Sequence, residues 1–179
     1  GMIPWVYFNE MITRGLNLFL ANAHLIKKLY FKHSALVWIY LGICVLNHLI
    51  FLTLVIIGYI FLGHPIGWGT LWMLVLWIPL TILGSGIGLL AGLLNIFLRD
   101  IGQLVPIILQ LTFWLTPIVY MPAILPERYQ SWLEWHPFYA LVNGYQQVLL
   151  WGENPDWQKL LYPLALGVAL LILGAFLYK

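Results

Sequence analysis

An apolar run extends from Ala35 to Leu62 and contains no acidic residue, lysine or arginine. As a helix it would rise about 42 Å at about 1.5 Å per residue, more than the roughly 30 Å hydrocarbon core of a bilayer. A soluble domain could not cover so much apolar surface, because 63% of the residues are hydrophobic and only 8% are charged. The run therefore predicts a membrane-spanning helix in an integral membrane protein.

Further segments share this apolar character. The predicted spans are about 1–20, 35–62, 70–94, 104–121 and 160–178. Before the last span, two shorter segments at about 126–135 and 137–151 predict re-entrant or interfacial helices on the outer side. The fold class is thus an all-α, multi-span helical bundle forming one transmembrane domain over 1–179. The first segment looks like the tail of a spanning helix whose beginning is absent, so we expect the chain to be N-terminally incomplete, although Gly1-Met2 also fits a true start.

The distribution of positive charge predicts the orientation of these spans. Of the 8 lysines and arginines, only Arg128 and Lys159 fall on the side that carries the re-entrant pair. Basic residues favour the cytoplasmic side of short loops. Lys27 to Lys32, Arg99 and Lys179 are therefore expected to be cytoplasmic.

The span at 104–121 follows the adjacent charges Arg99 and Asp100. Asp100 with Gln103 three residues later predicts a capping box at a helix start, and Arg99 predicts an anchor at the cytoplasmic interface. The helix is expected to run from Leu104 to Tyr120, with Pro117 kinking or ending it.

The most basic stretch, Asn22 to His33, contains no acidic residue. Its apolar stripe and neighbouring lysines predict either a solvated interfacial turn or a short docking helix. The residues of the docking hypothesis are Leu25, Ile26, Lys27, Lys28 and Leu29.

Polar and small residues inside the spans predict contacts between helices. Gly84, Gly88 and Gly92 form small-xxx-small pairs, which let another helix approach closely. Asn47 and His48 lie near the centre of their span, where polar groups usually face other helices. Interhelical hydrogen bonding is favoured there over a proton relay, because no carboxylate is evident at matching depth. Glu10 and Arg14, one helical turn apart, can pair.

The ordered set of segments resembles the membrane subunits of type-2 ATP-binding-cassette exporters, especially those that export polysaccharides, O-antigen or teichoic-acid-like polymers. The resemblance covers essentially the whole chain. It rests on the segments IPWVYFNE, NAHLIKKLYF, FLRDIGQLVPIILQLTFWLTPIVY and LPERYQSWLEWHPFYALVNGYQQVLL.

This resemblance implies a half-channel in the bacterial cytoplasmic (inner) membrane that pairs with a second copy and is driven by a separate ATPase subunit. The partners would be that ATPase, the second copy, the lipid bilayer and a glycan substrate, with no nucleic acid. The chain would be no enzyme and hold no cofactor, since its partner binds ATP; independently, it contains no Gly-Lys-Ser/Thr phosphate loop. Asn22 to Lys32 would be the coupling loop, and the helices of 126–151 the outer gate.

Aromatic residues gather towards the expected outer half of the membrane. Phe113, Trp114 and Tyr120 fit either an interfacial aromatic belt or the wall of the path, where their rings would stack on sugar C–H faces. Both interpretations stay open on the sequence alone.

Other functions fit the sequence less well. A membrane-embedded acyl or glycosyl transferase would need converging carboxylates or a His–carboxylate pair, and the candidates are scattered singles. They are His24, His33, His48, His136, Glu127 and Glu134. An exporter of a drug or lipid, and a small channel or assembly module, are the remaining alternatives.

Overall fold

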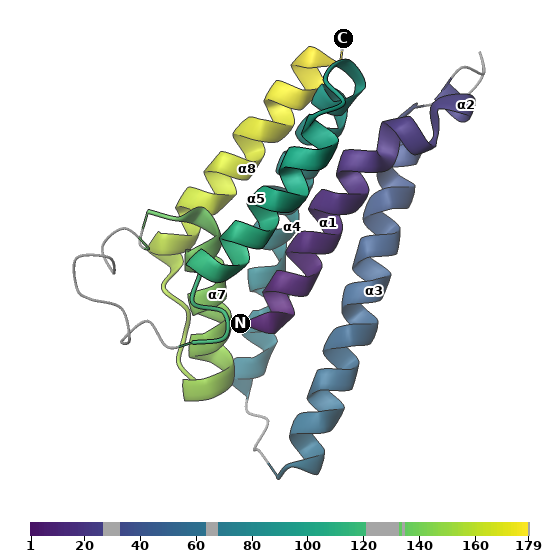
Figure 1. The fold of residues 1–179 in the computed structure, drawn as a ribbon. Helices are drawn as coiled ribbons and strands as arrows, with labels where there is room; N and C mark the ends of the chain where they lie inside the picture. Colours follow the sequence, from purple (N-terminus) through teal and green to yellow (C-terminus); the bar gives the residue numbers. More distant parts are fainter. Residues whose placement is uncertain (27–32, 64–67, 121–132, 134, 179) are drawn as a thin grey trace.

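The computed structural model of the chain is a bundle of helices (Figure 1). It describes residues 1–26, 33–63, 68–120, 133 and 135–178, and this part contains no strand. The predicted fold class, an all-helical membrane bundle, is confirmed.

The helices follow the predicted segments closely. They are α1 (Met2–Ala21), α2 (Ala23–Ile26), α3 (His33–Phe61), α4 (Trp72–Phe97), α5 (Ile101–Leu115), α7 (Pro137–Gln146) and α8 (Trp157–Leu177), with a 3₁₀ turn at Trp68–Leu71 and a π-helical turn at Gln147–Trp151. In the part of the chain that the structure describes, three candidate spans are long and apolar enough to cross a membrane: Ser34–Phe61, Gly69–Phe97 and Trp157–Leu177.

Helix α5 is shorter than expected. It ends at Leu115 instead of Tyr120, so it rises only about 22 Å. Thr116 has an extended backbone (φ −88°, ψ 135°), the conformation that a following proline favours. The expectation that Pro117 kinks or ends the helix is confirmed, but the predicted bound was too far along the chain.

The two ends of the bundle carry different segments. Helix α2, the turn between α4 and α5 and the end of α8 lie together at one end, which we call the α2 end (Figure 1). Helix α7 and the end of α5 lie towards the opposite end, the α7 end. Successive long helices therefore run in opposite directions between the two ends.

Helix α4 lies at the centre and packs most extensively on α1 and α8. A Cβ atom on Gly88 would lie 2.8 Å from the carbonyl oxygen of Met11 in α1, and one on Gly86 would lie 2.7 Å from the carbonyl oxygen of Gly167 in α8. Because real Cβ atoms do not approach other atoms so closely, these backbones could not meet at larger residues. The predicted close approach at the glycine face of α4 is confirmed, and its partners are helices of the same chain.

Helix α7 attaches to the bundle by its predicted apolar face. Phe138, Leu141, Val142, Tyr145 and Val148 are buried and Leu149 is half-buried. The Gln146 side-chain amide also donates a hydrogen bond of 3.2 Å to the carbonyl oxygen of Pro117. Most of the other predicted re-entrant segment, 126–135, lies outside the described residues.

Candidate functional site: a groove between α1 and α5

A groove of about 500 Å³ separates the outward faces of α1 and α5. Its lining residues recur at helical spacing on both helices, so each helix contributes one face. They are Met2, Trp5, Asn9 and Thr13 of α1, and Pro106, Leu109, Gln110, Phe113 and Trp114 of α5. The groove thus has both an aromatic part and a part rich in amide and hydroxyl groups.

The aromatic part combines the two helices. The ring centroids of Trp5 and Phe113 are 5.3 Å apart, and those of Phe113 and Trp114 are 5.4 Å apart in an edge-to-face arrangement. Trp5 is buried, whereas Trp114 is 63% exposed and leaves its ring open to a ligand. The structure therefore brings together two of the three residues proposed for the path.

Tyr120, the third residue, has a different environment. Its hydroxyl lies 3.2 Å from the carbonyl oxygens of both Trp114 and Leu115 and donates to them. The last carbonyls of a helix lack partners within the helix, so this hydroxyl satisfies open groups at the end of α5. Tyr120 is not among the residues that line the groove.

The polar part of the groove lies on α1. The Thr13 hydroxyl donates to the Asn9 side-chain oxygen at 3.1 Å, and beside them the Arg14 Nε donates to Glu10 at 2.7 Å. The predicted Glu10–Arg14 pair is confirmed. Asn9 and Thr13 were not predicted to line the path, although their four-residue spacing within an apolar segment was a signal for it.

A polar contact ties this face to α3. The Asn47 side-chain amide donates to Glu10. The next residue, His48, is buried, with its ring centroid 4.3 Å from that of Tyr7. The prediction that Asn47 and His48 face other helices is confirmed. The premise that no carboxylate lies at matching depth was wrong, because α3 returns beside α1, which supplies Glu10.

Arg99 and Asp100 lie exposed at the α2 end, before the start of α5. Asp100 occupies the N-cap position but its side chain makes no capping hydrogen bond, so the predicted capping box is wrong. Its backbone is already helical (φ −65°, ψ −25°). The amides of Ile101, Gly102 and Gln103 bond to the carbonyls of Leu98, Arg99 and Asp100, which leaves none of these three for the carboxylate.

The predicted coupling residues fall largely outside the described part. The backbone of Leu25 and Ile26 forms the end of α2, whereas Lys27, Lys28 and Leu29 lie outside the described residues. Their role stays a prediction.

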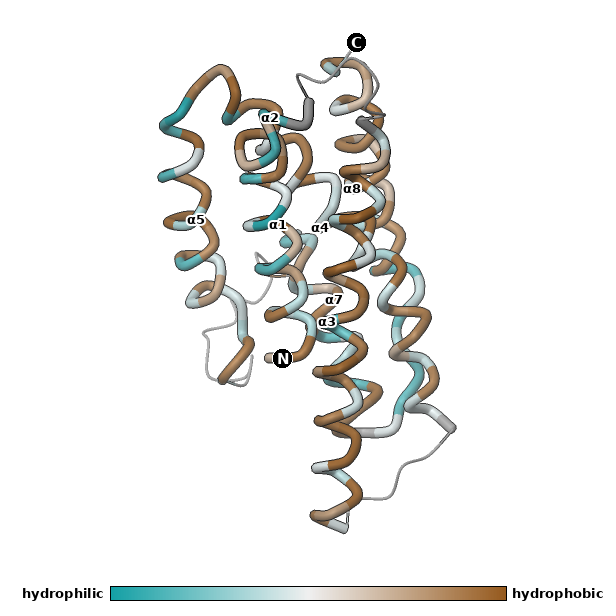
Figure 2. Tube along the Cα trace, turned by 90° about the vertical axis from the view of Figure 1, so that its right-hand side faces the viewer, coloured by the Kyte–Doolittle hydropathy of each residue, from teal (hydrophilic) through white to brown (hydrophobic). Residues whose placement is uncertain are grey.

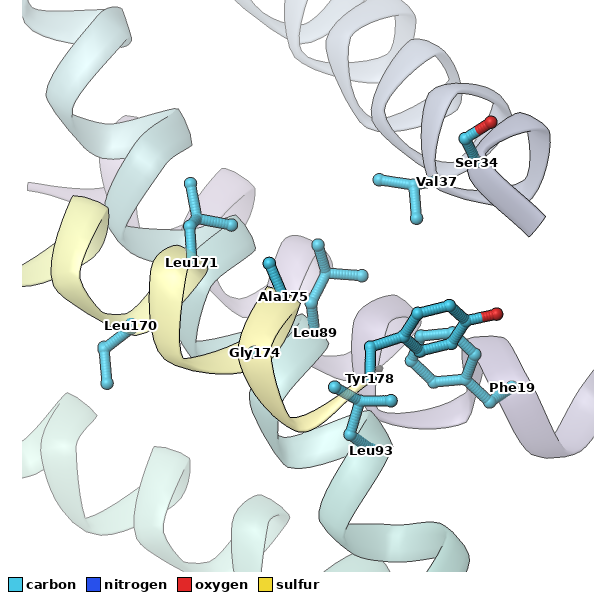
Figure 3. Close-up of a pocket in the computed structure, with 10 residues that line it drawn as sticks. All are labelled: Phe19, Ser34, Val37, Leu89, Leu93, Leu170, Leu171, Gly174, Ala175 and Tyr178. Carbon is cyan, nitrogen blue, oxygen red and sulfur yellow. The ribbon is translucent and has the colours of Figure 1, made fainter. Parts of the chain in front are cut away.

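A second cavity, of about 410 Å³, lies between α3 and α8 over α4 (Figure 3). Apart from the hydroxyls of Ser34 and Tyr178, its side chains are hydrocarbon. The lining residues are Phe19, Ser34, Val37, Leu89, Leu93, Leu170, Leu171, Gly174, Ala175 and Tyr178. Such a surface suits an apolar chain and offers few partners to a hydrated sugar, so the groove between α1 and α5 is the better candidate for a polar substrate. Within the described residues, no cluster of His, Cys, Asp and Glu could hold a metal ion.

Comparisons with known proteins indicate the family of the chain. The family model of the ABC-2 type transporter matches residues 1–150. The chain is 30% identical to the O-antigen export system permease protein RfbA of Klebsiella pneumoniae, over 100% of this chain and 69% of the relative. It is 26% identical to RfbA of Myxococcus xanthus, over 100% of this chain and 70% of the relative. It is 24% identical to the polysialic acid transport protein KpsM of Escherichia coli, over 60% of this chain and 42% of the relative. The extent of the family match shows that the chain belongs to the ABC-2 type transporter family.

Proposed function

We propose that the chain is the membrane (permease) subunit of an exporter that moves a polysaccharide or a lipid-linked glycan out across the bacterial cytoplasmic membrane. The observation that carries this proposal is the groove between α1 and α5. It places an open aromatic face, Trp114, beside amide and hydroxyl groups within a bundle of apolar helices. The similarity to proteins named for O-antigen export and polysialic acid transport supports a glycan as the cargo.

The energy source of this exporter is a separate ATPase subunit, and the chain itself is no enzyme and carries no cofactor or nucleic acid. The sequence contains no Gly-Lys-Ser/Thr phosphate loop that could bind ATP. The basic stretch from Asn22 to Lys32 faces the cytoplasm and docks on that ATPase, as the positive-inside rule supports. On this orientation the α2 end is cytoplasmic and the α7 end is outside.

A second copy of the chain completes the path, and α5 supplies the contact. Leu109 is the only residue of α5 that is buried within the chain. The remaining apolar side chains of α5 offer a face to a partner helix: Leu104, Ile107, Ile108, Leu111 and Leu115 are exposed. Gly84, Gly88 and Gly92 lie against α1 of the same chain, so they do not carry this contact.

The function is tested by deleting the gene in its source organism and following the glycan. We expect the polymer to disappear from the cell surface and to accumulate inside, because synthesis continues without export. Return of the wild-type gene should restore surface polymer. In parallel, the protein purified with its ATPase should contain two copies of each subunit and hydrolyse ATP. Normal surface glycan in the deletion strain contradicts the proposal.

The docking of the basic stretch is tested by replacing Leu25, Ile26 and Leu29 together with serine. We expect the variant to insert normally but to lose most ATP-driven export, because the apolar stripe that transmits movement to the membrane helices is gone. Insertion is measured by the amount in the membrane, coupling by hydrolysis and export in the same vesicles. The control replaces Ile57, Ile60 and Leu62, which are exposed near the other end of α3, with serine. Full export by the triple serine variant rules out this docking site.

A further inference from the structure

Helix α1 carries a ladder of polar side chains along one side. Asn9, Thr13 and Asn17 follow one another at four-residue spacing, and the Glu10–Arg14 pair lies beside them. Thr13 and Asn17 are exposed, and Arg14 keeps 46% of its side chain exposed even within the ion pair. Hydrophilic positions recur along α1 (Figure 2).

This ladder does not suit contact with lipid tails. Ionisable and amide groups inside a bilayer are costly, and they normally face a water-filled cavity or another protein segment. Thr13 donates to Asn9, the Asn17 side-chain amide donates to the backbone carbonyl of Thr13, and Glu10 accepts from both Arg14 and Asn47. These bonds satisfy only part of the hydrogen-bonding capacity of the Asn9, Thr13 and Arg14 side chains. The remaining donors and acceptors need partners on the open side of α1.

The chemistry of the two open surfaces on α1 indicates what those partners are. Asn9 and Thr13 line the groove with α5, where the opposite wall contributes Gln110 and the open ring of Trp114. The same two residues also line an adjoining hollow of about 600 Å³ that reaches Glu10 and Arg14. A sugar presents hydroxyl groups at its edge and C–H groups on its faces. Amide, hydroxyl and guanidinium groups can hydrogen-bond the sugar hydroxyls, and an indole ring can stack on the C–H faces.

We propose that Asn9 and Thr13, which face α5 across the groove, and Arg14 in the adjoining hollow form the hydrophilic wall of the glycan path and hydrogen-bond sugar hydroxyls of the passing chain. The inference rests on the proposed function. It adds that α1 is a substrate-contacting helix and not only a scaffold. A hydrated polymer would exchange hydroxyl partners along the ladder from Asn17 to Asn9, because residues four apart lie about 6 Å from each other along the axis.

Accessibility to a water-soluble thiol reagent tests the wall directly. The variants Thr13→Cys and Asn9→Cys are each made in a Cys44→Ala background. Each is tested in membrane vesicles with its ATPase bound. The controls are Leu46→Cys and Ile50→Cys, which replace exposed apolar residues of α3. We expect methanethiosulfonate ethylsulfonate to label the α1 positions about tenfold faster than the α3 positions, because the reactive thiolate forms in water and not in lipid.

Two labelling results would contradict the proposed hydrophilic wall on α1. Labelling at Thr13→Cys as slow as at Ile50→Cys shows that α1 faces lipid or tightly packed protein. Rapid disulfide formation between two copies at Thr13→Cys, with loss of labelling, shows that this side of α1 is an interface between copies.

Export measured in the same vesicles tests whether the glycan contacts the hydrophilic wall on α1. Attachment of the bulky sulfonate at Thr13→Cys should lower ATP-driven export several-fold, whereas treatment of Ile50→Cys should leave export unchanged. Fast labelling without loss of export shows a water-lined wall that the glycan does not contact, which overturns the proposal. If untreated wild-type protein exports no glycan while labelling is fast, the proposed function fails and the water-lined wall stands.

Discussion

Replacing Gly88 with valine should remove most of the protein from the membrane. A Cβ atom at this position would lie 2.8 Å from the carbonyl oxygen of Met11 and 3.1 Å from the Cα atom of Ile12, and both are backbone atoms that cannot turn away. Helix α1 would have to separate from α4 along their shared contact. Overpacking of this kind costs about 1–3 kcal/mol or more, and about 1–2 kcal/mol is enough to change abundance several-fold.

The matched control is Gly42→Val on α3, where an added Cβ would meet nothing within 4 Å. It introduces the same side chain into a membrane helix without touching a neighbour. We expect this variant to reach the wild-type level on a membrane immunoblot, while Gly88→Val falls at least several-fold. Gly15→Ala should also lower the level, because its Cβ would lie 2.7 Å from the backbone of Gly88, but by less than Gly88→Val because alanine adds one carbon and valine three. A wild-type amount of Gly88→Val would refute the close approach of α1 and α4.

Replacing Trp114 with alanine should lower glycan export while leaving the amount of protein unchanged. The indole ring is 63% exposed at the edge of the groove, so its loss removes little packing within the chain. A lost aromatic contact of about 0.5–1.5 kcal/mol corresponds to roughly a two- to tenfold weaker hold on the glycan. Surface polymer and its length distribution, divided by the membrane level of the protein, measure the effect.

Trp38→Ala on α3 provides the control for this substitution. The Trp38 side chain is 72% exposed and is not among the residues of the groove. Export per molecule should therefore stay near the wild-type value. An interfacial aromatic belt makes the opposite prediction, because a belt residue anchors the helix and its loss lowers protein level and export together. If Trp114→Ala reduces export only in proportion to protein level, Trp114 belongs to the belt and not to the path.

The sequence predicted the helices well because apolar length and proline position act locally. The run from Ala35 to Leu62 became α3, and Pro137 begins α7 as the first-turn preference of proline suggests. The predicted end of α5 lay too far along the chain. Pro117 favours an extended conformation in the preceding residue, Thr116, so the helix ends at Leu115.

The contents of the groove could be predicted only in part. Phe113 and Trp114 were candidates because aromatic residues near a membrane surface are conspicuous in a sequence. Asn9 and Thr13 were not, because their role depends on α5 lying against α1, a pairing between distant segments that no local pattern encodes. The same holds for the contact of Asn47 with Glu10, which joins residues far apart in the chain.

The capping box at Asp100 failed for a different reason. The pattern describes a helix whose first amides are free, but the turn after α4 already supplies backbone carbonyls to these amides. A sequence pattern cannot show that a preceding turn has taken the partners that a side chain would otherwise need.

The backbone-to-backbone contacts of α4 have a mechanical consequence. Gly86 and Gly88 let α8 and α1 lie very close to α4. A small separation of these helices would leave an empty gap that is too narrow for a lipid tail to fill. Helix α5, in contrast, buries only Leu109 within the chain, and lipid tails are as apolar as the leucines that it exposes. The molecule therefore has a stiff centre of three helices and a compliant flank. A force applied at the α2 end would therefore move α5 relative to the other helices and change the width of the groove between α1 and α5.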